Sequence, residues 1–364
     1  MTVGRSAPLD RRLIVRADAT TESGTGHMMR TLALAQAWLD AGGHARWLVA
    51  DGPAALLERI AHEGIEVVSI AASAGSRADA DALREELGRY PEATAVVDGL
   101  PFDEAYLDAL GDTFARVLLI ADRANRARYP VGFLLNQNAH ADRTAYPADA
   151  TCRFLLGTRY VLLRREFMAD PPPRTTPGVA HRILVTFGGA DPTGMTARTV
   201  EALRLLPRDL QAIVEVRFII GAANADGRAI ASAVASPDLG YRASLERAVD
   251  DMPARMAWAD LAITSGGSTV WELARTGCPA LVVETVPLER LLVAGLDRVG
   301  LFGRLGPEAR LETRRMANEI AAKAEDMPWR AAMSELGMRL VDGQGARRVV
   351  DALAGRTDLD EEGT

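Results

Sequence analysis

The sequence predicts an α/β protein of two Rossmann-like, doubly wound domains that face a central cleft. Its 364 residues exceed the usual size of one hydrophobic core, so two domains are expected. Short apolar runs alternate with helical patterns through both halves of the chain, which is typical of parallel sheets covered by helices. A segment rich in proline and glycine separates the two halves.

Runs rich in Val, Ile and Leu predict the strands in order along the chain. These runs do not alternate between polar and apolar residues, so both faces of each strand should be covered. In the first half the expected strands span residues 12–17, 44–50, 65–70, 94–99, 116–122, 131–137 and 153–158. In the second half they span residues 182–187, 215–221, 260–264 and 279–284.

The domain boundaries follow from these elements. Residues 1–170 form the expected N-terminal domain, and residues 182–355 the expected C-terminal domain. Between them, residues 171–181 ("PPPRTTPGVAH") predict a stiff linker. Residues 356–364 ("RTDLDEEGT") predict a solvated acidic tail.

The composition argues against several functional classes. A formal net charge of -7 provides no global basic field, so neither nucleic acid nor an anionic membrane is an expected partner. Cys152 and Cys278 lie far apart without ligand-like spacing, which argues against a disulfide framework, a zinc site or a thiol relay. Because there is neither an apolar signal segment nor a run of about 18 apolar residues, we expect a cytoplasmic protein without a membrane span.

The stretch "SGTGHMMRTLALAQAW" follows the first predicted strand and holds a histidine at a helix start. Met29 stands where a dinucleotide fingerprint has its third glycine, and no Walker pattern follows, so this turn predicts neither NAD nor ATP as a cofactor. Gly26 makes the turn tight, and His27 lies off the buried stripe of the helix. Ligands of such folds bind beyond the carboxyl ends of the strands, where this turn lies.

His27 is a candidate general base. The positive end of a helix dipole disfavours an imidazolium, so a histidine here tends to stay neutral and able to accept a proton. Arg30 is on the same helix face and is expected to meet an anionic ligand. The alternative is a solvent-exposed histidine with no chemical role.

In the second domain, "ADLAITSGGSTVWELARTGCPALVV" predicts strand, glycine-rich turn, helix and strand. Backbone amides and hydroxyls of such a turn suit a phosphate group. Glu272, one turn later, suits the two hydroxyls of a ribose. Alternatively, Thr269 and Glu272 form a capping box that only closes the helix start. The turn "FGGADPTG", with Gly188 and Gly189, gives a second glycine-rich edge.

Polar side chains also end strands of the first domain. Amides and carboxylates at such positions suit a hydroxyl-rich or acetamido ligand such as a sugar. Alternatively, they cap helices or form Asx turns. The residues concerned are Asp98, Asp122, Asn136, Gln137 and Asn138.

Motifs from about residue 12 to 305 stand in an order that resembles a known family. They are "RADATTESGTGHMMRTLALAQAW", "VVDG", "FLLNQNAHADRTAY", "LLGTRYVLLRREF", "ILVTFGGADPTG" and "MAWADLAITSGGSTVWELARTGCPALVV". This order resembles the UDP-sugar hydrolases of pseudaminic acid biosynthesis, the PseG/SpsG type. The second domain is also similar to MurG, the N-acetylglucosaminyl transferase of peptidoglycan synthesis.

The resemblance implies a GT-B architecture that binds UDP mainly through its C-terminal domain. It implies that His27 is the catalytic histidine, that water attacks the anomeric carbon, and that UDP leaves with inversion and without a metal. The resemblance implies UDP-binding roles for Ser265, Gly266, Gly267, Ser268, Thr269 and Glu272, and the second glycine-rich edge adds Gly188 and Gly189 to the expected UDP-binding residues. The expected substrate-binding residues are Gly26, Arg30, Asp98, Asn136, Gln137, Asn138 and Arg290.

The chain departs from this family in one segment. Where the relatives carry paired amides that face the donor sugar, this chain has Leu288, Glu289 and Arg290 in "ETVPLERLL". A site built to hydrogen-bond a particular sugar loses affinity for it when the polar partners are replaced, so the altrose-type diacetamido sugar of the family is not the expected substrate. Arg290 could instead meet an anionic sugar such as a uronic acid.

Three functions follow from these observations. The first is a UDP-sugar hydrolase in which His27 activates water. The second is a GT-B glycosyltransferase that moves a sugar from a UDP donor to a small acceptor, such as a nucleobase or an antibiotic precursor. The third is a nucleotide-sugar binding protein without catalysis.

Overall fold

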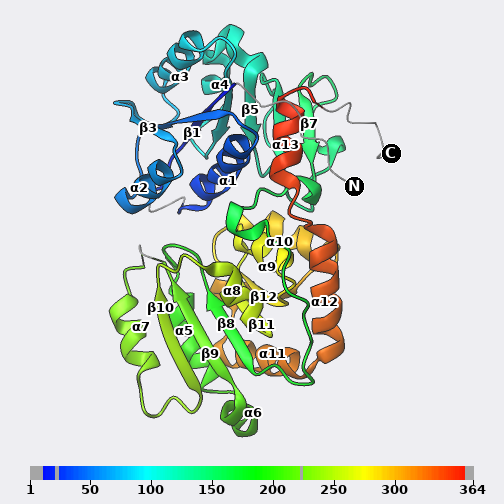
Figure 1. Cartoon of the computed structure of the whole chain (residues 1–364). Coiled ribbons are helices and arrows are strands. Elements are labelled where there is room, and N and C mark those ends of the chain that lie inside the picture. The colour runs from blue at the N-terminus through cyan, green and yellow to red at the C-terminus, as the bar shows by residue number, and fades with distance from the viewer. Residues whose placement is uncertain (1–10, 21–23, 222–223, 357–364) are drawn as a thin grey trace. The chain divides into compact units, whose positions relative to one another are not determined.

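The computed structural model describes residues 11–20, 24–221 and 224–356, and the chain divides into two compact units. Unit 1 comprises Met1–Arg165 and Gly343–Thr364, and unit 2 comprises Glu166–Asp342. Each unit has one parallel sheet with helices packed on it, as the apolar runs predict (Figure 1). The predicted α/β class is therefore confirmed.

Unit 1 contains a seven-stranded sheet in the order β3-β2-β1-β4-β5-β6-β7. The strands are β1 (Arg12–Ala17), β2 (His44–Val49), β3 (Glu66–Ser69), β4 (Thr94–Asp98), β5 (Val117–Ile120), β6 (Phe133–Asn136) and β7 (Arg153–Leu156). The helices are α1 (Gly26–Asp40), α2 (Ala54–His62), α3 (Arg77–Arg89), α4 (Glu104–Ala109) and α13 (Gly345–Leu353). The chain order changes direction between β1 and β4, which is where doubly wound sheets bind ligands.

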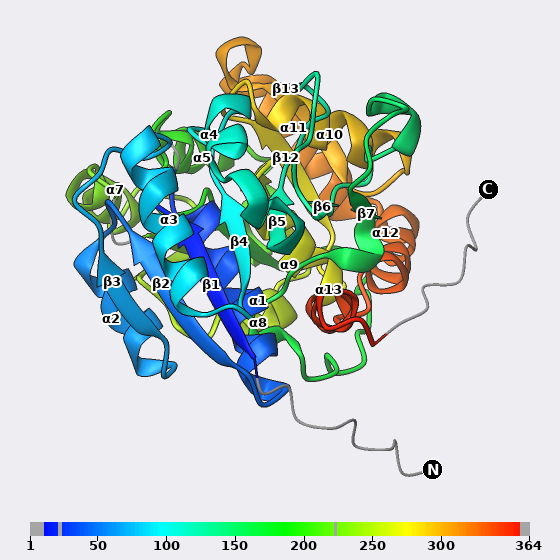
Figure 2. The same ribbon diagram turned by 90° about the horizontal axis from the view of Figure 1, so that it is seen from above.

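The two faces of this sheet have separate cores. On β1, Leu13 and Val15 pack toward α1 and α13, whereas Ile14 packs toward α3 and α4. Figure 2 shows α3 and α4 on one face of the sheet. Both faces of the strand are buried, which explains why its sequence is apolar without alternation.

Unit 2 contains a six-stranded sheet in the order β10-β9-β8-β11-β12-β13. The strands are β8 (Arg182–Thr186), β9 (Glu215–Ile220), β10 (Arg242–Arg247), β11 (Leu261–Ser265), β12 (Ala280–Glu284) and β13 (Gly303–Pro307). The helices are α5 (Met195–Leu203), α6 (Arg208–Ile213), α7 (Gly227–Val234), α8 (Met252–Trp258), α9 (Thr269–Arg275), α10 (Glu289–Arg298), α11 (Thr313–Glu325) and α12 (Met327–Leu340).

The last helix belongs to unit 1, although the sequence places it in a C-terminal domain of residues 182–355. Val349 and Val350 of α13 join the core that covers α1, and Figure 1 shows α13 beside this sheet. The physical reason is the strongly one-sided apolar face of α13, which is buried against α1 rather than in unit 2. The predicted acidic tail, from residue 357 on, lies outside the described residues.

The predicted linker is held against unit 2 by arginine side chains. Arg174, within it, donates to the carbonyl oxygens of Met256 and Ala257 at 3.1 and 3.3 Å. Arg330 of α12 donates to the carbonyl of Pro177 at 2.8 Å. Both partners in each contact belong to unit 2, so this segment is part of unit 2 rather than a separate linker.

Two further findings concern the described part of the chain. No helix there is long and apolar enough to cross a membrane. Within the same residues, no group of three or more His, Cys, Asp or Glu side chains could hold a metal ion.

Candidate active site

A continuous polar network lies at the carboxyl ends of β4, β5 and β6 and at the start of α1. Asp98 is the last residue of β4, and Asn136 is the last residue of β6. Asp122 follows β5, and His27 lies in the first turn of α1. Because the strands are parallel and adjacent, their carboxyl ends bring these groups to one edge of the sheet.

His27 is paired with a buried carboxylate. Its Nδ1 lies 2.8 Å from Oδ1 of Asp98, a side chain with no exposed surface. Burial alone would raise the pKa of Asp98, but Arg30 and His27 hold it below its ordinary value, so this group is ionised and can only accept hydrogen bonds. The Nδ1 atom must therefore carry the proton, and Nε2 is left with a lone pair that can take up another.

Arg30 joins two carboxylates. Its Nε and Nη2 donate to the two oxygens of Asp98 at 2.6 and 2.7 Å, and its Nη1 donates to Oδ1 of Asp122 at 2.7 Å. Burial lowers the pKa of Arg30, but these two carboxylates raise it above its ordinary value. Arg30 was expected to meet an anionic ligand. In the structure its guanidinium forms ion pairs with the carboxylates of Asp98 and Asp122.

The Asp98 side chain also differs from its predicted role. It was expected to bind substrate directly, yet its carboxylate is fully buried and bonded to His27 and Arg30. In this position it can orient the imidazole, and a direct contact of Asp98 with a substrate stays a prediction. Gly26, the other residue of this turn in the expected site, is the first residue of α1.

The amide cluster after β6 is buried and bonded internally. Asn136 donates to the Tyr146 hydroxyl at 3.0 Å, and Oε1 of Gln137 accepts from the Leu162 amide at 3.0 Å. Asn138 donates to Oδ1 of Asp122 at 2.9 Å. These amides were expected to face a sugar; they are buried and bonded within unit 1, and their contact with a sugar stays a prediction.

The first glycine-rich turn of unit 2 lies between β8 and α5, and a side chain of this turn already accepts hydrogen bonds from the first backbone amides of α5. Asp191, at φ +48°, accepts from the amides of Met195 and Thr196 at 2.9 and 2.8 Å. Burial raises the pKa of this carboxyl. Gly188 and Gly189 precede it, and because Asp191 takes the free amides of α5, this turn has less to offer a phosphate.

The second glycine-rich turn, between β11 and α9, keeps its amides available. Gly266 donates to the Val283 carbonyl at 3.0 Å. Within the described residues, no acceptor is found for the amides of Gly267, Ser268 and Thr269. Ser265 ends β11, and its hydroxyl lies on the same turn. Consecutive free amides on a glycine turn suit an anion.

The start of α9 bears on the alternative role of Glu272. The helix begins at Thr269, and Ser268 is its N-cap residue, without a side-chain cap bond. The capping box would have Thr269 as the N-cap, one residue later than observed, and both roles of Glu272 stay predictions. Glu272 is half-buried on the first turn of α9.

The segment after β12 is ordered by Glu289. Its Oε2 accepts from the Thr285 amide and hydroxyl at 2.7 and 3.0 Å. Burial raises the pKa of Glu289. Arg290, next in sequence, is exposed on α10, and so is Leu288. A side chain at Gly266 would meet Val293 of α10 at 2.5 Å, so the glycine turn packs directly on this helix.

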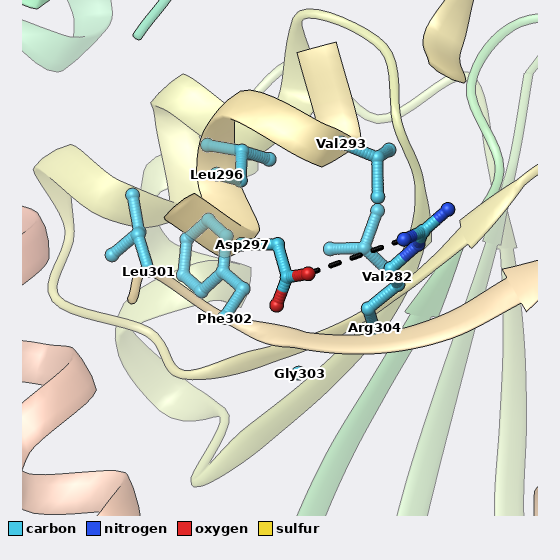
Figure 3. A pocket seen from close by; sticks show the side chains of 8 residues that line it. All are labelled: Val282, Val293, Leu296, Asp297, Leu301, Phe302, Gly303 and Arg304. Atoms are coloured by element: carbon cyan, nitrogen blue, oxygen red, sulfur yellow. Dashed lines mark ion pairs between the residues drawn. The ribbon is translucent and has the colours of Figure 1, made fainter. Parts of the chain in front are cut away.

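A crevice of about 170 Å³ lies beside α10, and Figure 3 shows the side chains that line it. It has no space for a water molecule, and Asp297 and Arg304 face each other across it at 4.0 Å. None of the predicted site residues lines this crevice. Its lining residues are Val282, Val293, Leu296, Asp297, Leu301, Phe302, Gly303 and Arg304.

The pairing of His27 and Arg30 with particular carboxylates was missed by the sequence analysis. Asp98 lies 71 residues from His27, and Asp122 lies 92 residues from Arg30. A usable signal exists, since a carboxylate that ends the strand beside β1 must lie near the helix that follows β1. The local pattern at the strand ends predicts carboxylates that bind a substrate and does not pair them with α1.

Comparisons with known proteins give distant sequence relatives, and no family model matches the chain. SpsG of Bacillus subtilis, a spore coat polysaccharide biosynthesis protein, is 23% identical over 242 residues, or 66% of this chain and 70% of that protein. A UDP-N-acetylglucosamine–N-acetylmuramyl-(pentapeptide) pyrophosphoryl-undecaprenol N-acetylglucosamine transferase of Nitrosococcus oceani is 31% identical over 173 residues, 46% of each chain. An uncharacterized protein of Methanocaldococcus jannaschii is 19% identical, and the chain spans 57% of its length.

Solved structures match over nearly the whole chain. MurG of Acinetobacter baumannii superposes with a TM-score of 0.65 at 16% identity and covers 95% of this chain and 100% of its own. The chain has a GT-B glycosyltransferase-like fold. The Anabaena protein HepE, solved with UDP-glucose, has the same fold at a TM-score of 0.60 and 13% identity, over 94% of this chain and 98% of its own. The GT-B fold predicted from the motif order is thus confirmed.

Proposed function

We propose that this GT-B protein is an enzyme that acts at the anomeric carbon of a UDP-sugar and releases UDP, with His27 as the general base. The observation that carries the proposal is the 2.8 Å contact between Nδ1 of His27 and the ionised, buried Asp98. This pairing leaves Nε2 to take a proton from the attacking group. The side chain of His27 is 15% exposed, which gives a small nucleophile access to it.

In the proposed step His27 Nε2 removes a proton from a water molecule as the water oxygen bonds to the anomeric carbon. The bond from that carbon to the diphosphate oxygen breaks, and its electron pair leaves with UDP. Attack from the side opposite the leaving group inverts the anomeric carbon. Asp98 stabilises the imidazolium that forms, because its carboxylate already accepts a hydrogen bond from Nδ1–H.

Unit 2 is proposed to bind UDP. The amides of Gly267, Ser268 and Thr269 and the hydroxyl of Ser265 would take the diphosphate, because they form a turn of donors without acceptors in the described residues. Glu272 would accept from the ribose hydroxyls, which is the role implied by the resemblance to MurG. The 31% identity to a UDP-N-acetylglucosamine transferase supports a UDP-sugar as the ligand.

A glycosyltransferase is the second candidate, and a specific observation favours it. The Nitrosococcus relative is named a transferase, and so is the glycotransferase of kitacinnamycin, whose solved structure matches this chain. The chemistry of unit 1 is the same in both cases, since His27 would deprotonate an acceptor hydroxyl or amine in place of water.

The test follows UDP release from a panel of UDP-sugars, with and without small acceptors. Release without an acceptor supports the hydrolase, and release that requires an acceptor supports the transferase. His27→Ala should lower kcat by about 100-fold to 10,000-fold, the usual contribution of a general base, while UDP binding measured by calorimetry is retained. His62→Ala, at an exposed histidine of α2, is the matched control and should retain activity. Unchanged turnover in His27→Ala would refute the role of His27.

A further inference from the structure

Asp122 belongs to the polar network but does not touch His27. Its Oδ1 accepts from Arg30 Nη1 at 2.7 Å and from Asn138 Nδ2 at 2.9 Å. Its side chain is 42% exposed, whereas that of Asp98 has no exposed surface. Burial would raise the pKa of Asp122, but Arg30 holds it far below its ordinary value. The ionised carboxylate of Asp122 is therefore linked to the imidazole of His27 through the guanidinium of Arg30.

The charges around a protonated His27 balance only when Asp122 is counted. Arg30 and Asp98 form a bidentate pair whose net charge is zero. Arg30 Nη2 also lies 3.2 Å from Nδ1 of His27, where its positive charge opposes protonation of the ring. Asp122 binds the remaining nitrogen, Nη1, and supplies the negative charge that offsets this opposition.

We propose that Asp122 is a positioning residue for proton transfer, which holds Arg30 by Nη1 and offsets its charge so that His27 can take up a proton. The inference rests on the proposed role of His27 as the base. Among the described residues, the charged groups that face the imidazole are Asp98 from β4 and Arg30 from α1, with Asp122 behind Arg30. Tyr146 is linked to this group through Asn136, and its pKa is raised to about 12, so it stays neutral.

The test is an NMR titration of His27 in the full chain, with Asp122→Asn as the main variant. The chain has five histidines, so the His27 signal is assigned by its loss in His27→Ala. Removing the charge of Asp122 should lower the His27 titration midpoint on the order of 1 pH unit, the size that Coulomb's law gives for one charge at roughly 10 Å and an effective dielectric constant of about 20. Asp122→Ser, which also removes the charge, should shift the midpoint in the same direction and serves if Asp122→Asn does not fold.

Two controls separate this effect from a structural one. Asp108→Asn removes a carboxylate of similar exposure, 44%, which pairs with Arg128 at 2.7 Å, and it should leave the midpoint unchanged. Asp122→Glu retains the charge and should restore the wild-type midpoint. An unchanged or higher midpoint in a folded, charge-removing variant would overturn the proposal.

The kinetic readout should agree with the titration. In Asp122→Asn the acidic limb of the kcat/KM profile should move to lower pH, and kcat should fall roughly 10-fold because the base is weaker. If the wild-type protein turns over no UDP-sugar, the proposed function fails, whereas the NMR titration still decides the role of Asp122. The two failures are therefore distinguishable.

Discussion

Asp98→Asn is the substitution that tests the His27 network most directly. The amide keeps the size of the carboxylate but removes its charge, and it can present an NH₂ group to Nδ1 of His27. That group favours the tautomer with the proton on Nε2, which cannot act as a base. Loss of tautomer control at a histidine base costs about 10,000-fold in kcat in serine proteases, so a loss of about 1,000-fold to 10,000-fold is expected.

The same substitution should cost stability. Breaking a buried ion pair costs about 3–5 kcal/mol when one charge is left without its partner. Here Arg30 keeps Asp122 at 2.7 Å, so the lower end of that range, about 3 kcal/mol, is expected. Because Arg30 and His27 lower the pKa of Asp98, its contribution is complete above the ordinary carboxyl pKa of about 4 and is lost as the pH falls below it.

The assay combines urea unfolding at pH 7 and at pH 3.5 with UDP-release kinetics. Leu83→Ala, in the core on the α3 face of unit 1, is the matched control. It should cost about 2–5 kcal/mol and leave kcat unchanged, because it does not touch the network. A folded Asp98→Asn protein with wild-type kcat would refute the assignment of Asp98 as the residue that orients His27.

Three further outcomes are expected. Glu272→Ala should weaken UDP binding in calorimetry by about 10-fold without lowering Tm, since loss of a ribose contact costs about 1.4 kcal/mol; a lower Tm with unchanged affinity would favour a capping role. Gly345→Ala should lower the free energy of unfolding in urea by about 1–3 kcal/mol, because the added Cβ would lie 2.2 Å from the Val161 carbonyl oxygen. Gly88→Ala in α3, where the added Cβ meets nothing within 4 Å, should raise it by about 1 kcal/mol. Burial raises the pKa of Glu289, so the stability that the protonated side chain contributes is present at low pH and lost as the pH rises. Glu289→Gln should therefore have a free energy of unfolding on the order of 1 kcal/mol above that of the wild type at pH 8, and the difference should vanish at pH 4.

The class of fold, and the edge of the sheet on which the site lies, follow from local patterns in the chain. Apolar runs without alternation predict strands buried on both faces, and this local pattern survives because β1, β4 and β5 are covered by helices on each side. The glycine turn before His27 and the polar residues after the strands could be located from the chain alone, since strand ends and helix starts have local signatures.

The tertiary structure decided which of these polar groups touch one another. His27 pairs with Asp98 because β1 and β4 are neighbours in the sheet, with Ala17 in register with Asp98, and no local pattern reports that adjacency. Asn136 and Gln137 turn inward because their hydrogen-bonding partners, Tyr146 and Leu162, come from later parts of the chain.

The return of α13 to unit 1 has the same origin. Its apolar face is visible in the sequence, but the surface that it covers, on α1, lies some 300 residues earlier. The periodicity of apolar residues predicts that a helix buries one face, but it does not predict the surface against which that face packs. Apolar burial and the pairing of buried charges bring together residues that are far apart in the sequence. The partners of α13, Arg30 and His27 are therefore known only from the folded chain.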